Sequence, residues 1–267
     1  MKAHEKFILI TGASSGIGTG FAKAFARKGH SLILVARRLD RLQFLSNELK
    51  TLGAGSIRIL DMDLNAPEAP KKIWNLCHEQ QWRVEGLINN AGLGWQKDLL
   101  LLSEEQVNQM LMVNLVSLTH LCRLFSADMT VRRSGFILNI ASTAGFQPVP
   151  HFSVYAATKS YVVSLSEGLY EELKRSNVLV SCLCPGPVHT EFQEKAQMPK
   201  RIFAAAQSVE EVVVAGMKLL ARKRALGWTS LFQRVFSFGS ELTPRALRRW
   251  LAARLLECTE RLEPTDI

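Results

Sequence analysis

The sequence predicts an α/β fold, a doubly wound parallel sheet in three layers with helices on both faces. Short apolar runs alternate with longer amphipathic stretches along the first 190 residues. Each run has the length and composition of a strand that is buried on both faces. Strand, helix, strand units of this kind join parallel strands through right-handed crossovers. The predicted strands are Phe7–Ile10, Ser31–Ala36, Ile57–Leu60, Gly86–Ile88, Phe136–Ile140 and Leu179–Leu183.

The amphipathic stretches between the first strands predict helices. Apolar residues from Phe21 to Ala26 recur with helical spacing, and this stretch ends at Gly29. The stretch Arg41–Leu52 ends in the same way at Gly53. Glycine commonly ends a helix because it adopts the left-handed conformation without steric cost.

The tail follows another pattern. After Pro185-Gly186-Pro187 the chain predicts helices at Glu191–Lys200, Ser208–Leu220 and Pro244–Leu262. In the last helix Thr243 is a suitable N-cap before Pro244, and an apolar stripe lies opposite several arginines. The stripe consists of Leu247, Leu251, Leu255, Cys258 and Leu262. We expect residues 191–267 to form a substrate lid and a helical C-terminal extension that cover the sheet rather than extend it.

Length and composition predict one soluble domain over residues 1–267. A chain of 267 residues with 47% hydrophobic residues is long enough for a large α/β core. No stretch approaches the roughly 18 to 20 unbroken apolar residues of a membrane span, and Phe7–Ile10 is too short for a signal-peptide core. The five cysteines are odd in number and lack zinc-type spacing, so we expect reduced thiols, a cytoplasmic protein and no metal site.

The chain is basic, with a formal charge of +9 and an isoelectric point near 9.5. Such a charge suits nucleic acid, a membrane surface or a phosphorylated cofactor, and charge alone does not choose among them. The segment Arg222–Arg254 holds eight basic residues against Glu241 alone, with aromatic and aliphatic residues between them. It suits peripheral contact with an anionic membrane, a lid over a lipophilic substrate, or packing on its own protein or a second subunit. Because the chain shows no nucleic-acid-binding module, we expect no nucleic-acid partner.

A glycine-rich loop directly follows the first predicted strand. The run Thr11-Gly12-Ala13-Ser14-Ser15-Gly16-Ile17-Gly18 places three glycines and two hydroxyl groups at a strand-to-helix turn. Backbone amides and a helix N-terminus at such a turn bind a pyrophosphate. The GxxxGxG spacing lacks the Lys-Ser/Thr ending of a P-loop, which disfavours a nucleoside triphosphatase. The loop therefore predicts a Rossmann-like dinucleotide site.

The end of the second strand indicates which dinucleotide binds. Enzymes that prefer NAD place a carboxylate there for the ribose 2′-hydroxyl. This strand ends Val35-Ala36-Arg37-Arg38. Two guanidinium groups without a carboxylate attract a 2′-phosphate through charge-assisted hydrogen bonds. Arg37 and Arg38 therefore predict NADP(H).

Tyr155 and Lys159 lie four residues apart in a helix that is expected to begin near Ser153. This spacing places both side chains on one helix face. An ammonium group beside a phenol lowers the phenol's pKa, and bringing tyrosine near neutrality needs about 4 kcal/mol. Lys159 and an oxidised nicotinamide together supply that charge, so Tyr155 is predicted to exchange a proton with a carbonyl or alcohol oxygen. Ser142 follows the run Phe136–Ile140, at the sheet edge where ligands of α/β folds bind.

In order along residues 6–190, these motifs resemble the short, single-domain branch of the short-chain dehydrogenase/reductase family. Their joint order carries the resemblance, because each motif alone is weak. The motifs are Thr11–Gly18, Asp63, Asn89-Asn90-Ala91-Gly92, Asn114, Ser142, Tyr155-Ala-Ala-Thr-Lys159 and Pro185-Gly186-Pro187-Val188-His189-Thr190.

The resemblance implies roles for residues that local reasoning leaves open. It implies that Ser142 holds the substrate oxygen, that Lys159 also binds the nicotinamide ribose, and that Asn114 anchors a water in a proton relay. The implied cofactor contacts run from the adenine at Asp63 to the nicotinamide carboxamide at Thr190. With the glycine loop and the arginines, the predicted cofactor set is Gly12, Ser14, Ser15, Gly16, Ile17, Gly18, Arg37, Arg38, Asp63, Leu64, Asn90, Ala91, Gly92, Tyr155, Lys159, Pro185, Gly186, Val188 and Thr190.

The sequence thus predicts an NADP(H)-dependent oxidoreductase that transfers a hydride between the nicotinamide and a lipophilic carbonyl or alcohol. We expect a homodimer or homotetramer in the cytoplasm, with membrane association left open. A non-catalytic NADPH sensor is the alternative, which the intact set of Ser142, Tyr155 and Lys159 disfavours. His151 is weighed as a pocket residue against a surface or cap position, and His189 as a spacer. No motif in residues 191–240 identifies the substrate.

Overall fold

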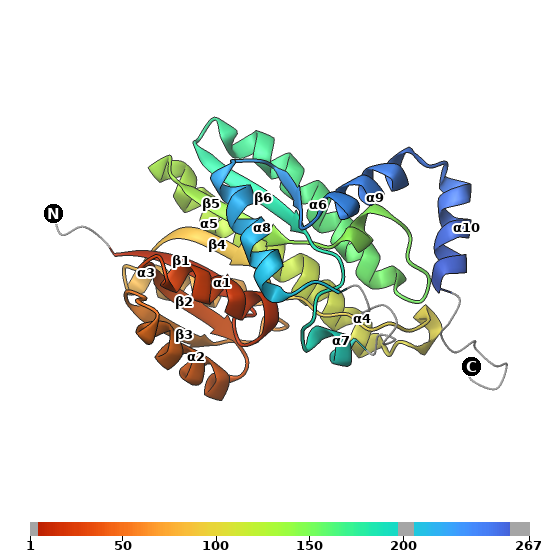
Figure 1. The fold of residues 1–267 in the computed structure, drawn as a ribbon. Coiled ribbons are helices and arrows are strands. Elements are labelled where there is room, and N and C mark those ends of the chain that lie inside the picture. Colours follow the sequence, from red (N-terminus) through yellow and green to blue (C-terminus); the bar gives the residue numbers. More distant parts are fainter. Residues whose placement is uncertain (1–4, 197–205, 257–267) are drawn as a thin grey trace.

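The computed structural model describes residues 5–196 and 206–256. They form a seven-stranded parallel sheet with the order β3-β2-β1-β4-β5-β6-β7 (Figure 1). The strand order reverses between β1 and β4, which creates the crevice where open α/β sheets bind ligands. The strands are β1 (Lys6–Thr11), β2 (Ser31–Ala36), β3 (Ile57–Asp61), β4 (Arg83–Asn89), β5 (Gly135–Ile140), β6 (Val178–Cys184) and β7 (Leu226–Trp228).

The six predicted strands are present, and most are longer than predicted by one or more residues. The expectation that the tail only covers the sheet was wrong, because β7 extends it beside β6. Three residues that include Gly227 are too few to show a strand pattern. Long-range bonds hold β7 in place: the Cys182 amide donates to Ala225 O at 2.7 Å, and the Ser181 hydroxyl donates to Arg224 O at 2.8 Å.

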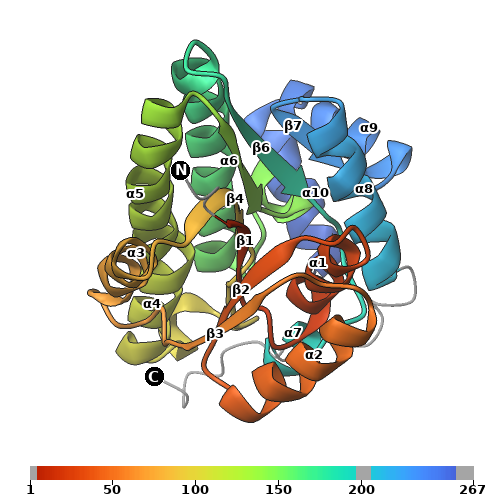
Figure 2. The same cartoon turned by 90° about the vertical axis from the view of Figure 1, so that its left-hand side faces the viewer.

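Helices cover both faces of the sheet and complete the three layers (Figure 2). One layer contains α1, α2 and α8, with α1 in contact with both others. The opposite layer contains α3, α4, α5 and α6. Their bounds are α1 (Gly16–Ala26), α2 (Leu39–Thr51), α3 (Ala69–Glu79), α4 (Glu104–Leu111), α5 (Leu118–Arg132), α6 (Ser153–Lys174) and α8 (Val209–Ala221).

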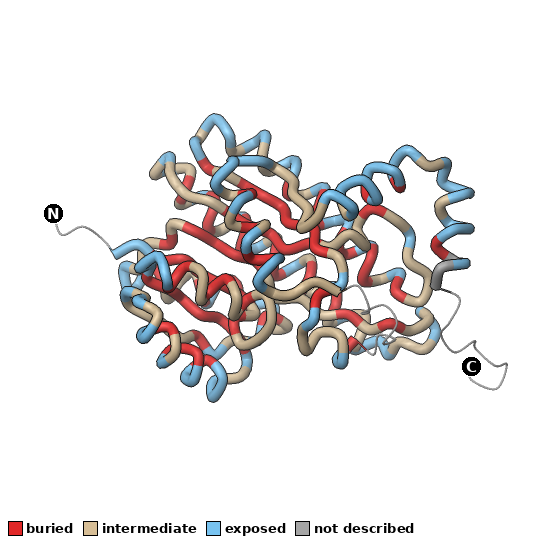
Figure 3. Tube along the Cα trace, in the orientation of Figure 1, coloured by how far each residue is buried: buried red, intermediate tan, exposed pale blue. Residues whose placement is uncertain are grey.

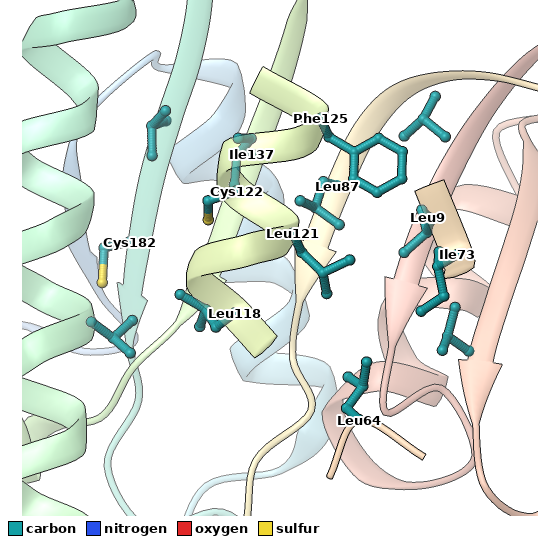
Figure 4. Close-up of a cluster of buried hydrophobic side chains, with 14 of the residues drawn as sticks. Leu9, Leu64, Ile73, Leu87, Leu118, Leu121, Cys122, Phe125, Ile137 and Cys182 are labelled. Atoms are coloured by element: carbon teal, nitrogen blue, oxygen red, sulfur yellow. The ribbon is translucent and has the colours of Figure 1, made fainter. Parts of the chain in front are cut away.

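The core is continuous on both sides of the sheet because successive strand residues point to opposite faces. Leu9 of β1 packs toward α3 and α5, whereas Ile8 and Ile10 pack toward α1 and α8. Figure 4 shows the first side, where Leu9, Leu87 and Ile137 meet side chains from the helices. Those helix side chains include Ile73, Leu118, Leu121 and Phe125. The central part of the sheet is mostly buried in Figure 3, whereas β3 and β7 at its two edges are more exposed.

A helix of 29 residues, Glu104–Arg132, is long and apolar enough to cross a membrane. Half of its most apolar window is buried inside the protein. Met110, Leu121 and Phe125 are buried, with Leu121 and Phe125 in the sheet-facing core. This element is therefore a core helix, divided into α4 and α5 by a π-helical turn at Met112–Ser117.

The C-terminal part forms α7 (Phe192–Lys195), α9 (Leu231–Leu242) and α10 (Arg245–Leu256). Only four residues of the predicted helix Glu191–Lys200 are helical in the described part. The prediction Ser208–Leu220 corresponds to α8, and Pro244–Leu262 overlaps α10 as far as the description extends. Helix α9 was missed. Thr243, the predicted N-cap, ends α9 instead, because its hydroxyl donates to Gly239 O at 2.7 Å.

Four of the five cysteines lie in the described part, where Cys77, Cys122, Cys182 and Cys184 are buried and free. Cys182 and Cys184 share one sheet face with Sγ atoms 3.8 Å apart, as their spacing in the strand predicts. Burial raises the pKa of Cys77 and of Cys122 to about 12, so these thiols remain protonated at neutral pH. Cys258 and Leu262 of the predicted apolar stripe lie outside the described residues.

Candidate active site

A cavity of about 1180 Å³ opens at the carboxyl ends of the strands. The glycine loop forms one end, the start of α6 lines the middle, and α7, α9 and α10 close the other side. Most of the predicted site lies in its wall: Gly12, Ser14, Ser15, Gly16, Ile17, Arg37, Arg38, Asp63, Leu64, Asn90, Ala91, Gly92, Ser142, Tyr155, Lys159, Pro185, Gly186, Val188 and Thr190. Two predicted residues, Gly18 and Asn114, are not among its lining residues.

The glycine loop places backbone atoms without side chains at the cavity wall. Gly12 has φ +63°, which favours glycine. A Cβ on Gly18 would lie 2.3 Å from Gly12 O, so Gly18 allows α1 to pack directly against the loop. Asn90 holds the loop from the other side, since its Nδ2 donates to Thr11 O at 3.0 Å and to Gly12 O at 3.2 Å. The loop is therefore a rigid cradle for an anion at the N-terminus of α1.

Basic side chains gather where β2 enters α2. Arg38 donates to Ser14 Oγ from Nε at 3.3 Å and from Nη2 at 3.1 Å, and its Nη1 lies 2.8 Å from Glu191 Oε2. Arg37 Nη1 lies 3.8 Å from Asp63 Oδ2. Arg41 also binds Glu191. Arg41 was not among the predicted site residues, and it lies in the first turn of α2, outside the cavity lining.

Ser142 and Tyr155 come from β5 and α6. Ser142 follows β5 and caps the turn Thr143–Phe146, where its Oγ accepts from the Ala144 amide at 3.1 Å. Tyr155 lies in the first turn of α6 and is only 8% exposed. Its ring stacks on Phe152 at a centroid distance of 4.2 Å and lies 5.5 Å from the ring of Phe192. Aromatic packing therefore fixes the phenol in the cavity wall.

Lys159 follows one helical turn after Tyr155, as predicted. Its Nζ donates to Ile140 O at 2.9 Å and lies 5.6 Å from the centroid of the Tyr155 ring. The side chain is only 5% exposed. Burial disfavours the ammonium and lowers the pKa of Lys159 to about 8.

Burial acts on the Tyr155 pKa against the direction predicted from Lys159 and an oxidised nicotinamide. Burial raises the pKa of Tyr155 well above its usual value, and a hydrogen bond with Ser142 opposes this rise only in part. Helical spacing brings Lys159 near the ring, and the desolvation of a buried phenolate acts in the opposite direction to that charge. Tyr155 is therefore a neutral phenol at pH 7, with a proton to donate.

Asn114 lies in the π-helical turn between α4 and α5, a distortion frequent at functional sites. Its Oδ1 accepts from the Leu93 amide at 3.0 Å, and its Nδ2 donates to Leu93 O at 2.9 Å. Nδ2 also donates to Thr158 Oγ1 at 3.0 Å. Asn114 thus joins the segment after β4 to the residue beside Lys159, while the water relay stays a prediction.

The two histidines considered in the sequence, His151 and His189, are not among the cavity-lining residues. His151 Nδ1 is hydrogen-bonded to Asp98 Oδ1, so it ties the loop after β4 to the start of α6. His151 has φ +60°, a conformation that costs energy for a residue other than glycine. His189 is exposed, consistent with a spacer, and its amide donates to Gln207 O at 2.9 Å.

Beyond Tyr155 the cavity is lined by large apolar side chains that no motif identified. They come from four separate regions: the loop after β4, the residue before α6, α7 and α9. Their only signal in the sequence was the aromatic content of the segment that forms α9. The group includes Leu93, Trp95, Phe152, Phe192, Phe232 and Phe236.

The residues present fit a nicotinamide dinucleotide. The Gly12 cradle suits a pyrophosphate, and Arg38 offers guanidinium donors at the adenosine end. Gly92 leaves room between two polar groups, because a Cβ there would lie 3.4 Å from both Asn114 Oδ1 and Lys159 Nζ. Thr190 lines the cavity next to the glycine loop, where a Cβ on Gly16 would lie 2.9 Å from Thr190 Cγ2.

Comparisons with known proteins agree with this geometry. Residues 6–201 match the model of the short chain dehydrogenase family. An uncharacterized oxidoreductase of Bacillus subtilis is 35% identical over 191 residues, which cover 72% of each chain.

Two solved structures extend the likeness to nearly the whole chain. A short-chain dehydrogenase from Sphingobium yanoikuyae in complex with NADPH is 30% identical, with a TM-score of 0.82 over 98% of this chain and 99% of that one. An alcohol dehydrogenase from Comamonas testosteroni, specific for bulky-bulky ketones, is 27% identical, with a TM-score of 0.76 over 98% of this chain and 97% of that one. The chain belongs to the short-chain dehydrogenase family of nicotinamide-dependent oxidoreductases, which act on CH–OH or C=O groups.

Proposed function

We propose that this enzyme catalyses reversible hydride transfer between NADP(H) and a lipophilic carbonyl or alcohol. One observation carries the proposal: Ser142, Tyr155 and Lys159 converge on the cavity that also contains the glycine loop. A proton donor, an oxygen-binding hydroxyl and a buried cation beside a dinucleotide cradle meet the needs of carbonyl reduction.

In this proposal Tyr155 is the general acid for reduction. Its raised pKa keeps the phenol protonated, so it donates its proton to the carbonyl oxygen. Ser142 Oγ holds that oxygen near the phenol. When bound, NADPH supplies the hydride. In the reverse direction Tyr155 must first lose its proton, so alkaline pH favours alcohol oxidation.

Lys159 and Asn114 support this proton transfer. A charged Lys159 stabilises negative charge on the phenolate and binds ribose hydroxyls of the cofactor. Asn114 fixes the Leu93 segment against α6 through its bonds to Leu93 and Thr158. We assign it the start of the relay that returns a proton to Lys159.

Replacing Tyr155 by phenylalanine tests the mechanism. We expect Tyr155→Phe to lower kcat for NADPH-dependent ketone reduction by roughly a hundredfold or more, with little change in NADPH binding. Tyr161→Phe is the matched control, because Tyr161 lies on the same helix, exposed and bonded to Thr119. Retained activity in Tyr155→Phe would overturn the mechanism. If the protein binds NADPH tightly but turns over no carbonyl, the alternative of a non-catalytic NADPH sensor would be favoured.

The preference for NADP(H) rests on the basic end of the cavity. Arg37 and Arg38 follow β2 directly, and the related Sphingobium enzyme was solved with NADPH. We expect kcat/KM with NADPH to exceed that with NADH by tenfold or more. Equal efficiency with the two cofactors would refute the preference.

The lipophilic substrate is inferred from the apolar wall around Tyr155. The related Comamonas enzyme is specific for bulky-bulky ketones, and Phe152, Phe192 and Phe236 offer such a substrate an apolar surface. We propose that residues 191–267 act as its lid within one domain. In support, α9 lines the cavity, and the Ser240 hydroxyl donates to Phe146 O at 3.0 Å.

We also propose that the outer face of this lid rests on an anionic membrane. Leu231, Val235, Phe238 and Leu242 form an exposed stripe along α9. The segment Arg222–Arg254 carries seven more positive than negative charges, which attracts acidic lipid and repels an identical segment of a second copy.

Vesicle co-sedimentation tests this contact. We expect binding to phosphatidylcholine vesicles only when they contain phosphatidylglycerol, and loss of binding in Leu242→Glu. Val131→Glu on α5 is the control, since both side chains are 86% exposed. A protein that stays in solution with both vesicle types would end the membrane proposal. The homodimer or homotetramer stays a prediction.

A further inference from the structure

Glu191 binds Arg38, one of the two arginines proposed to hold the cofactor's 2′-phosphate, and also binds Arg41 of α2. Its Oε2 lies 2.8 Å from Arg38 Nη1, and its Oε1 is bound by Arg41 Nη1. Lys195 Nζ lies 3.7 Å from Oε2. Arg38 and Arg41 lie about 150 residues earlier in the chain, so the ion pairs join two distant parts of the chain.

These ion pairs fix the segment that faces the reaction site. Glu191 directly follows Thr190, which packs on the glycine loop so closely that a Cβ on Gly16 would lie 2.9 Å from Thr190 Cγ2. It directly precedes Phe192, whose ring contacts Tyr155. Glu191 therefore holds residues 190–195 across the cavity, between the adenosine end and the phenol.

A carboxylate and a phosphate present similar oxygens to guanidinium donors. Arg38 and Arg41 lower the pKa of Glu191 to about 2, so the side chain is an anion at neutral pH. Arg38 directs Nε and Nη2 at Ser14 and Nη1 at Glu191, so a phosphate bound to this guanidinium would lie next to the Glu191 carboxylate. Two anions at this point repel each other, so they compete for the arginines.

We infer that Glu191 is an internal anion that occupies the Arg38–Arg41 site and that the 2′-phosphate of NADP(H) displaces. The inference rests on the proposed NADP(H) function and adds a specificity-determining residue. Displacement breaks the ion pairs that hold residues 190–195 to Arg38 and Arg41. Binding of the 2′-phosphate therefore releases the segment beside Tyr155. A cofactor without this phosphate leaves the ion pairs in place. The 2′-phosphate therefore binds at the Arg38–Arg41 site and also opens the reaction site beside Tyr155.

Calorimetric titration with two nucleotides tests the competition without turnover. The probes are 2′,5′-ADP, which carries the phosphate, and 5′-AMP, which lacks it. We expect Glu191→Gln to bind 2′,5′-ADP about tenfold more tightly than the unmodified protein, because charge-assisted bonds to the carboxylate are lost. The Kd for 5′-AMP should change less than about twofold.

Glu194→Gln is the matched control, because Glu194 lies in α7, the short helix that Glu191 precedes, and is exposed. It removes the same charge and should leave both Kd values unchanged. Equal or weaker binding of 2′,5′-ADP by Glu191→Gln would overturn the inference, because Glu191 would then not compete with the phosphate.

Hydrogen–deuterium exchange gives a second readout. In the unmodified protein 2′,5′-ADP should speed exchange of the amides of residues 192–196, and 5′-AMP should not. In Glu191→Gln the same amides should exchange quickly without any nucleotide. If Glu191→Gln and the unmodified protein behave alike while NADPH turnover is normal, only this inference fails. If neither protein binds 2′,5′-ADP, the NADP(H) preference fails with it.

Discussion

The Asn114 side chain donates a 3.0 Å hydrogen bond to Thr158 Oγ1, next in the chain to Lys159. The Thr158 hydroxyl donates in turn to Tyr155 O at 2.7 Å. Asn114 is 1% exposed and Thr158 is 1% exposed, so water does not compete for these bonds. The π-helical turn is thus joined directly to the backbone between the two reactive side chains.

Asn114→Ala should therefore reduce both stability and turnover. The variant leaves the Leu93 amide and carbonyl without their partner, which should lower the free energy of unfolding by about 2 to 4 kcal/mol. Urea denaturation followed by circular dichroism measures this loss. Asn108→Ala, on the exposed side of α4, should change stability by less than about 0.5 kcal/mol. Equal effects of the two variants would show that Asn114 is not a structural link.

The fold was predictable because each strand is a continuous apolar run that only a doubly covered sheet can bury. Strand β7 was not predictable, since Leu226-Gly227-Trp228 acquires its structure from pairing with β6. The catalytic helix was predictable from its spacing, whereas the pKa of Tyr155 was not, because spacing reveals neighbours but not burial. The role of Glu191 could not be predicted for a similar reason, because its arginine partners lie about 150 residues away in the sequence.

Carbonyl reduction should lose efficiency above about pH 8. Burial lowers the pKa of Lys159 to about 8, so its ammonium is charged below that pH and loses its proton as pH rises through it. Tyr155 keeps its proton over the same range, because its pKa is raised. A profile of kcat/KM against pH should therefore be flat near neutrality and fall above about 8.

Lys159→Met should remove that inflection and lower the rate by roughly a hundredfold. Lys174→Met is the control, because Lys174 lies at the exposed end of the same helix, and it should keep the inflection. An unchanged profile in Lys159→Met would assign the titration to another group.

Gly18→Ala should damage the anion cradle although Gly18 does not line the cavity. The added methyl would lie 2.3 Å from Gly12 O, which is backbone and moves only with the loop. We expect NADPH to bind at least tenfold more weakly and the free energy of unfolding to fall by about 1 to 3 kcal/mol. Cofactor fluorescence and thermal unfolding measure the two effects.

The control for this variant is Gly168→Ala on α6, where only Glu172 Oε1 comes within 4.0 Å of the new Cβ. That substitution should stabilise the helix by about 0.5 to 1 kcal/mol and leave NADPH binding unchanged. Normal NADPH affinity in Gly18→Ala would mean that the loop tolerates movement and is not a rigid cradle.

Helix α9 presents apolar side chains on two faces, and their roles should separate by mutation. Phe236 lines the cavity, whereas Leu242 lies on the exposed stripe. Phe236→Ala should raise KM for a bulky ketone about tenfold, since part of an aromatic contact worth about 1 to 3 kcal/mol is lost. KM for a small ketone should hardly change, because a small substrate does not extend from Tyr155 to α9. Leu242→Ala, assayed without vesicles, should leave both constants unchanged, and a parallel rise in both variants would show that α9 acts through folding rather than substrate contact.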